Sequence, residues 1–133
     1  MTGGVGDGRE EPEQLARALA RLGPANVVVT GGHRDRATDL LFDGHDLHEI
    51  PGERYPDGAA HGSGCTHSSV LAAHLALGFT PLEAARRAKA MAAAAVRDGL
   101  REVGSGAGPV DVLGVRGRSP AAPDRRPAAR PLS

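Results

Sequence analysis

The run NVVVT at residues 26–30 constrains the fold more than any other segment of the chain. Its β-branched residues favour a strand, and turn residues bound it on both sides. Gly23 and Pro24 precede the run, and Gly31 and Gly32 follow it. The pattern therefore predicts a short buried strand between two turns.

A helix is predicted immediately before this strand, over residues 12–22 (PEQLARALARL). Acidic residues stand near its start, and the Gly-Pro pair after it is a typical helix stop. Helix, short turn and buried strand in succession are typical of an α/β fold. The apolar side chains expected on the buried helix face are Leu15, Ala18, Leu19 and Leu22.

Residues 38–50 (TDLLFDGHDLHEI) predict two strands joined around Asp43-Gly44, because Asp-Gly between apolar runs is a strong hairpin signal. A helix is expected after Cys65, ending at Gly78. Its apolar residues are Val70, Leu71, Leu75 and Leu77.

A further helix is predicted from Thr80 to Asp98, with Gly99 after its end. Thr80 is an N-cap residue, Pro81 suits the first helical position, and Glu83 completes a capping box. A face of small residues suits close packing, and it consists of Ala85, Ala88, Ala92 and Val96. The charged residues expected on the solvent face are Arg86, Arg87, Lys89 and Arg97.

The 133 residues are enough for one domain or less. Lys and Arg together number 16, as do Asp and Glu, so no net charge attracts nucleic acid or an acidic membrane. The longest apolar run, residues 90–96, is shorter than the about 20 residues that cross a bilayer. One cysteine permits no intrachain disulfide and fits a reducing compartment. We therefore expect a cytoplasmic protein without nucleic-acid or membrane partners.

Composition changes at both ends of the chain. Residues 1–10 are rich in glycine and are expected to be flexible. Residues 115–133 are rich in proline and arginine and are expected to form a disordered tail. The folded part is therefore predicted to span residues 11–114.

The segment Gly62-Ser63-Gly64-Cys65 leads into the predicted helix and suggests an anion site. The first amides of a helix lack intrahelical acceptors, and glycine lets a ligand approach the backbone closely. A cysteine at such a position has a stabilised thiolate, which could take a proton or attack a substrate. From the residues alone, Cys65 as a small buried residue behind a simple turn is an equally good interpretation.

Several motifs together resemble one known family. Residues 61–100 begin with HGSGCT and contain two alanine-rich helices. They closely resemble the C-terminal segment of the hydroxymethylpyrimidine/phosphomethylpyrimidine kinases of thiamine biosynthesis, members of the ribokinase-like superfamily. Residues 26–50 are similar to that family's strand, Gly-Gly-His turn and hairpin, and residues 106–113 to its Gly-Pro-Val segment. The resemblance covers residues 12–113 and implies the C-terminal half of a ribokinase-like three-layer α/β fold, incomplete as a domain.

The resemblance also implies a function. Such kinases transfer phosphate from ATP, with Mg²⁺, to a pyrimidine alcohol or its monophosphate. Cys65 would be the catalytic base, and the backbone amides of Gly62, Ser63, Gly64 and Cys65 would face the transferring phosphoryl group. Contacts to the nucleotide would come from Thr30, Gly31 and Gly32.

The chain also departs from the family pattern. Thr30 stands where members often carry lysine, and Ala107 replaces a histidine of the terminal glycine loop. The family's N-terminal half, with most of the parallel sheet and the pyrimidine pocket, has no counterpart here. We therefore expect little turnover from this chain alone, and a need for a complementary N-terminal half or a homo-oligomer.

Three other interpretations remain open. The chain could be a non-catalytic remnant that retains phosphate, nucleotide or partner binding. It could belong to a pyridoxal-type vitamin kinase, where cysteine also occurs at the base position. A zinc site at His61, His67 and His74 is disfavoured, because the last two lie about 10 Å apart along a helix and no Cys-x-x-Cys accompanies them. No metal-ligating residue is therefore assigned.

Overall fold

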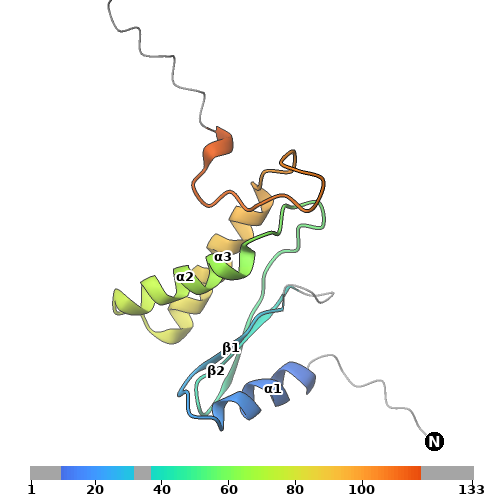
Figure 1. Cartoon of the computed structure of the whole chain (residues 1–133). Coiled ribbons are helices and arrows are strands. Elements are labelled where there is room, and N and C mark those ends of the chain that lie inside the picture. Colours follow the sequence, from blue (N-terminus) through green and yellow to red (C-terminus); the bar gives the residue numbers. More distant parts are fainter. Residues whose placement is uncertain (1–9, 32–36, 118–133) are drawn as a thin grey trace, which may run out of the picture.

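The structure is a computed structural model that describes residues 10–31 and 37–117 (Figure 1). It has three layers, with one helix on one face of a small sheet and two packed helices on the other. The predicted α/β class and the predicted order of elements are confirmed. That order is α1 (Glu10–Ala20), β1 (Val27–Val29), β2 (Asp39–Phe42), β3 (Leu47–Ile50), α2 (Ser63–Ala76), α3 (Pro81–Arg97) and the short 3-10 turn η1 (Val115–Gly117).

The sheet has the order β1-β2-β3, and both strand pairs are antiparallel. Leu41 of β2 lies opposite Val28 on one side and His48 on the other. The predicted hairpin forms at Asp43-Gly44. The Asp43 carboxylate accepts the backbone N–H groups of residues 45 and 46 at 2.9 and 2.7 Å, and Gly44 adopts a φ of 96°.

The two faces of the sheet bury separate apolar clusters. Under α1 the buried cluster consists of Ala16, Val27, Leu40 and Phe42. Under α2 and α3 it consists of Leu41, Ile50 and Ala85, with Val28, Leu71 and Leu82 packed against it. Since successive residues of a strand point to opposite faces, β2 supplies both clusters. Its four residues are accordingly all buried.

The predicted buried face of α1 was wrong. Ala16 is the residue of α1 that is fully buried against the sheet, whereas Leu15 and Leu19 are 46% and 38% exposed, and Leu22 is 81% exposed beyond the helix. A small residue brings the helix axis close to the sheet, so the leucines beside it are left at the edge of the contact. On α2 and after it, Leu75 and Leu77 are likewise exposed.

The predicted start of α3 is confirmed. Thr80 accepts the backbone N–H of Glu83, the Glu83 carboxylate accepts the N–H of Thr80, and Pro81 opens the helix. Asp98 is the C-cap, as the sequence indicated. The buried residues of α3 are all alanines, namely Ala84, Ala85, Ala88, Ala92 and Ala95. Their small side chains allow α2 and α3 to pack closely side by side.

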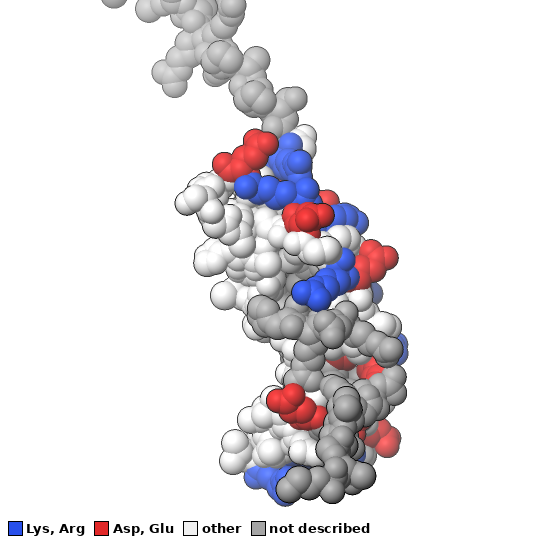
Figure 2. All heavy atoms as spheres, turned by 90° about the vertical axis from the view of Figure 1, so that its right-hand side faces the viewer, with Lys and Arg blue, Asp and Glu red and all other residues white. Residues whose placement is uncertain are grey.

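The molecular surface carries charges of both signs, interspersed on the face drawn in Figure 2. Within the described part of the chain, no helix is long and apolar enough to cross a membrane. The predicted flexible start, residues 1–10, lies outside the described residues except for Glu10, which begins α1. Residues 118–133 of the predicted tail also lie outside them, while residues 115–117 form η1.

Candidate active site

The turn before α2 places backbone amides at the surface. Gly62 is the N-cap, with φ 88° and ψ 3°, a left-handed conformation that favours glycine. No side chain caps the helix. The N–H of Ser63 donates to the Ala60 carbonyl at 3.1 Å. The amides of Gly64 and Cys65 therefore remain as helix-end donors without an intrahelical acceptor.

Space beside the turn is open as well. A Cβ built on Gly64 would meet no atom within 4 Å. The hydroxyl and amide of Thr66 both donate to the Gly62 carbonyl, at 2.9 and 3.0 Å, which holds the turn in register with α2. A ligand can therefore approach a fixed backbone end at which the helix dipole favours negative charge.

Cys65 is the third residue of α2, and its free thiol is exposed. The interpretation of Cys65 as a small buried residue is excluded by this exposure. The helix begins at Ser63, before the cysteine rather than after it, so the thiol lies within the first turn. The Cys65 thiol and the amides of Gly64 and Cys65 thus lie together in the first turn of α2.

A distant segment lies beside the turn. The N–H of His61 donates to the Gly108 carbonyl at 3.2 Å, and the N–H of Val110 donates to the His61 carbonyl at 3.0 Å. Gly108 has no room for a side chain, since a Cβ there would lie 1.8 Å from the Leu100 carbonyl oxygen. The glycine loop that contains Ala107 is thereby brought next to the start of α2.

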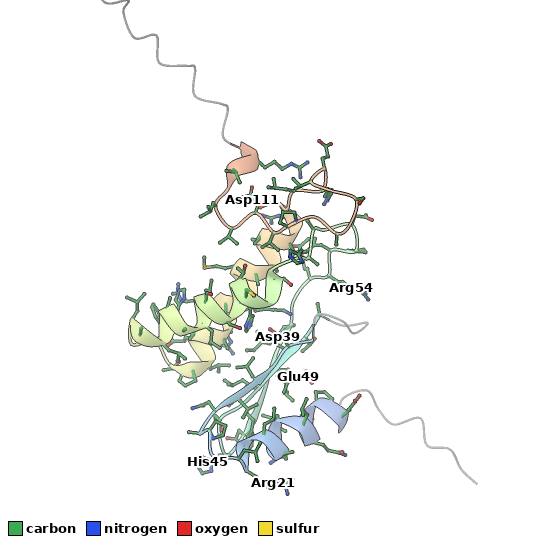
Figure 3. All side chains as sticks on the ribbon, in the orientation of Figure 1. Arg21, Asp39, His45, Glu49, Arg54 and Asp111 are labelled. Carbon is green, nitrogen blue, oxygen red and sulfur yellow. The ribbon has the colours of Figure 1, made fainter. Side chains whose placement is uncertain are left out.

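Asp111 anchors the end of this segment. Its backbone N–H donates to the Ala95 carbonyl of α3 at 3.0 Å, and its carboxylate accepts the N–H groups of Val115 and Arg116, both at 2.9 Å. The amides of Arg116 and Val115 hold the pKa of Asp111 below its usual value. Asp111, labelled in Figure 3, therefore contacts η1 through its carboxylate and α3 through its backbone N–H.

The residues predicted to contact the nucleotide follow β1. Thr30 is exposed, while Gly31 is buried, and a Cβ on Gly31 would lie 2.0 Å from the Thr38 carbonyl oxygen. The N–H of Gly31 donates to Asp39 Oδ1 at 2.9 Å. Gly32, the third predicted contact, lies outside the described residues.

Sequence reasoning missed a buried charge cluster at the start of β2. Asp39 is 1% exposed, and its Oδ1 accepts a hydrogen bond from Lys89 Nζ at 2.7 Å. His67 Nε2 lies 3.2 Å from Asp39 Oδ2, close enough for an ion pair but not aligned for a hydrogen bond. The prediction that Lys89 lies on the solvent face was wrong. A signal existed, because Lys89 stands one turn from Ala85 and from Ala92 on the alanine face.

Burial acts to raise the pKa of Asp39, but the contacts with His67 and Lys89 and the Gly31 amide outweigh it and lower the pKa. Asp39 is therefore an ionised carboxylate in the interior. A buried charge of this kind is tolerated because a lysine ammonium and a backbone amide compensate it.

The histidines do not form a metal site. His67 faces Asp39, and His74 Nδ1 contacts the Val70 carbonyl oxygen at 2.8 Å. Across residues 10–31 and 37–117, no group of three His, Cys, Asp or Glu side chains could hold a metal ion.

A family model described as phosphomethylpyrimidine kinase matches residues 1–111. The chain belongs to this family. The hydroxymethylpyrimidine/phosphomethylpyrimidine kinase of Rhizobium meliloti is 44% identical over 114 residues, which cover 83% of this chain and 43% of the relative. The chain thus spans less than half the length of this relative.

Solved structures agree with the family's fold. An ADP complex of Bacillus subtilis pyridoxal kinase matches with a TM-score of 0.73 at 30% identity, covering 81% of this chain and 43% of that one. Staphylococcus aureus pyridoxal kinase in complex with AMP-PCP and pyridoxal matches with a TM-score of 0.73 at 31% identity, covering 82% and 41%. The three layers of Figure 1 are therefore a portion of the ribokinase-like fold, as the sequence predicted.

Proposed function

We propose that the chain carries the phosphoryl-transfer turn of a hydroxymethylpyrimidine/phosphomethylpyrimidine kinase. The reaction is ATP-dependent transfer of phosphate to a pyrimidine alcohol, or to its monophosphate, in thiamine biosynthesis. The observation that carries the proposal is the uncapped start of α2, where the amides of Gly64 and Cys65 and an exposed thiol share one turn. A cytoplasmic location is part of the proposal, because a free thiol persists in a reducing compartment.

In this reaction Cys65 thiolate takes the proton from the substrate hydroxyl. The hydroxyl oxygen forms a bond to the γ-phosphorus of ATP, the bond from that phosphorus to the bridging oxygen breaks, and ADP leaves with the electron pair. The amides of Gly64 and Cys65 donate to the phosphoryl oxygens during transfer. Of the four residues in the proposed anion site, Gly62 shapes the turn, and Ser63 already donates its N–H to Ala60.

The nucleotide contacts are assigned to the turn after β1. Thr30 is exposed and offers a hydroxyl donor. The amide of Gly31 is occupied by Asp39, so Gly31 contributes by letting backbone segments approach closely rather than by donating to the nucleotide. Gly32 completes the proposed set. Mg²⁺ belongs to the proposal as an ion that accompanies the nucleotide phosphates.

The remainder of the site would come from outside the 133 residues given. The chain covers 43% of the Rhizobium meliloti relative, and the proposed partner is a complementary N-terminal half or a second copy of the chain. The exposed leucines Leu15, Leu19, Leu75 and Leu77 are consistent with surfaces that such a partner covers.

Two alternatives have their own support. The structural matches are pyridoxal kinases, which favours a pyridoxal-type substrate, yet the identity is 31% to the Staphylococcus aureus enzyme and 44% to the pyrimidine kinase. Thr30, which stands where family members often carry lysine, favours the second alternative, a non-catalytic remnant with residual nucleotide binding.

The direct test is release of ADP from ATP in the presence of hydroxymethylpyrimidine or pyridoxal. The 133-residue chain is assayed alone and mixed with the N-terminal half of the Rhizobium meliloti relative. We expect little turnover alone and pyrimidine-dependent turnover in the mixture. Cys65→Ala should abolish that turnover, while Ser69→Ala, an exposed change on α2, should leave it intact. Turnover of pyridoxal alone, or an unchanged rate with Cys65→Ala, would contradict the assignment.

A further inference from the structure

Three segments outside β2 contact the side chain of Asp39. Its carboxylate receives the Gly31 amide from the end of β1 and the Lys89 ammonium from α3, and it faces the His67 ring from α2. In Figure 3 the labelled Asp39 lies where the sheet faces the two helices. The side chains of Asp39, His67 and Lys89 are 2%, 8% and 13% exposed. The cluster is thus internal and joins the turn after β1 to β2, α2 and α3.

The side chain of Lys89 passes close to the backbone of Gly52 before it contacts Asp39. A Cβ on Gly52 would lie 2.3 Å from Lys89 Cε and 2.8 Å from the Ala37 carbonyl oxygen. The lysine stem therefore lies in van der Waals contact with the backbone that follows β3. Its ammonium ends on Asp39 Oδ1 rather than in solvent, so the ion pair is a built feature of the fold.

We propose that Asp39 is a positioning residue that fixes the turn after β1 relative to the first turns of α2. His67 is two residues beyond Cys65 on the same helix, so its contact with Asp39 sets the depth at which the Cys65 turn lies against the sheet. Gly31 adjoins the exposed Thr30, so the same carboxylate sets that turn. The functional meaning of the two turns rests on the proposed function, whereas the coupling between the turns does not depend on it.

The energetics favour a positioning role over simple stabilisation. Replacing a buried ion pair by apolar residues of similar volume is often neutral or stabilising, so an interior Asp and Lys are a poor source of stability. The hydrogen bonds that such a pair makes are directional, however. One carboxylate here accepts an amide and an ammonium on one oxygen and faces an imidazole with the other. An apolar side chain could fill the same space without fixing either turn.

The test compares amide resonances of the full chain by ¹H–¹⁵N NMR. In Lys89→Met we expect the largest shifts at Gly31 and at residues 65–67, although neither segment adjoins position 89 in sequence. Arg86→Met is the matched control, because it removes an exposed cation from the same helix. It should shift the amide resonances of neither segment. The double variant Asp39→Asn/Lys89→Met should return residues 65–67 toward their wild-type shifts, because no buried charge is left uncompensated. If Lys89→Met does not fold, the double variant is compared directly with the wild type.

Shifts confined to α3 in Lys89→Met would overturn the proposal, as would a double variant no closer to wild type than the single one. Ligand affinity distinguishes a positioning role from a purely structural one. We expect the AMP-PCP affinity of folded Lys89→Met to fall roughly tenfold, equivalent to about 1.4 kcal/mol, with Arg86→Met unchanged. Unchanged affinity in Lys89→Met would also overturn the positioning role. If the wild-type chain binds no AMP-PCP, the proposed function fails, while the amide comparison still decides the coupling.

Discussion

Lys89 Nζ lies 2.7 Å from Asp39 Oδ1, across a sequence separation of 50 residues and inside the protein. This contact joins the middle of α3 to the first residue of β2. It adds a polar contact between α3 and the sheet to the apolar packing of Ala85 on Leu41 and Ile50.

Replacing Lys89 should be costly. Lys89→Met leaves the Asp39 carboxylate buried without its main counter-charge, and the loss of one partner from a buried pair costs about 3–5 kcal/mol. Arg86→Met at an exposed position should change the free energy of unfolding by less than about 0.5 kcal/mol. Urea titrations followed by circular dichroism measure both. Equal, small effects from the two variants would show that the pair contributes nothing.

Stability should also depend on pH through Asp39. Its pKa is lowered in the folded protein, so its contribution is fully present above the unfolded value of about 3.9 and is lost as the pH falls through the folded value. The difference in unfolding free energy between wild type and Asp39→Asn should therefore shrink as the solution is acidified below about pH 4. Denaturant titrations across that range measure the difference, and a gap that widens on acidification would contradict the sign.

Two glycines of one loop should respond differently to the same change. Gly108→Ala places a Cβ 1.8 Å from the Leu100 carbonyl oxygen, whereas at Gly106 it would meet no atom within 4 Å. Such overpacking costs about 1–3 kcal/mol, so we expect Gly108→Ala to lower the midpoint of thermal unfolding and Gly106→Ala to leave it nearly unchanged. Equal midpoints would mean that Gly108 does not lie against the Leu100 carbonyl as described.

The thiol offers a chemical probe of the turn. Cys65 is exposed, and the chain has one cysteine, so a thiol reagent should label the native protein at this residue without denaturant. AMP-PCP should slow the labelling because its phosphates would occupy the space beside Gly64. Adenosine, which lacks phosphates, is the control and should not slow it. Protection by both compounds, or by neither, would contradict a phosphate at this turn.

Local signals in the sequence predicted the elements that they govern. The capping box at Thr80, the Asp43-Gly44 hairpin and the glycine turn before α2 each act within a few residues, and each is present. Such signals depend on backbone conformation and nearby hydrogen bonds, which a short segment determines by itself.

Features set by distant segments were not predictable in the same way. The leucine stripe of α1 was expected to be buried, but the sheet contacts Ala16, because close approach of the helix decides which face is covered. The pairing of Lys89 with Asp39 depends on how α3 lies over β2, which no local pattern encodes. For the candidate site, the sequence located the turn and its cysteine but not the interior cluster at Asp39.

The proposed function depends most on whether the start of α2 receives a phosphate. The most direct measurement is a titration of the ¹⁵N-labelled chain with AMP-PCP, followed at every assigned amide. We predict that the Gly64 and Cys65 amides shift most strongly, with Thr30 next and the residues of α1 unmoved. Saturable shifts that centre on α1 or the hairpin while Gly64 and Cys65 stay fixed would contradict it.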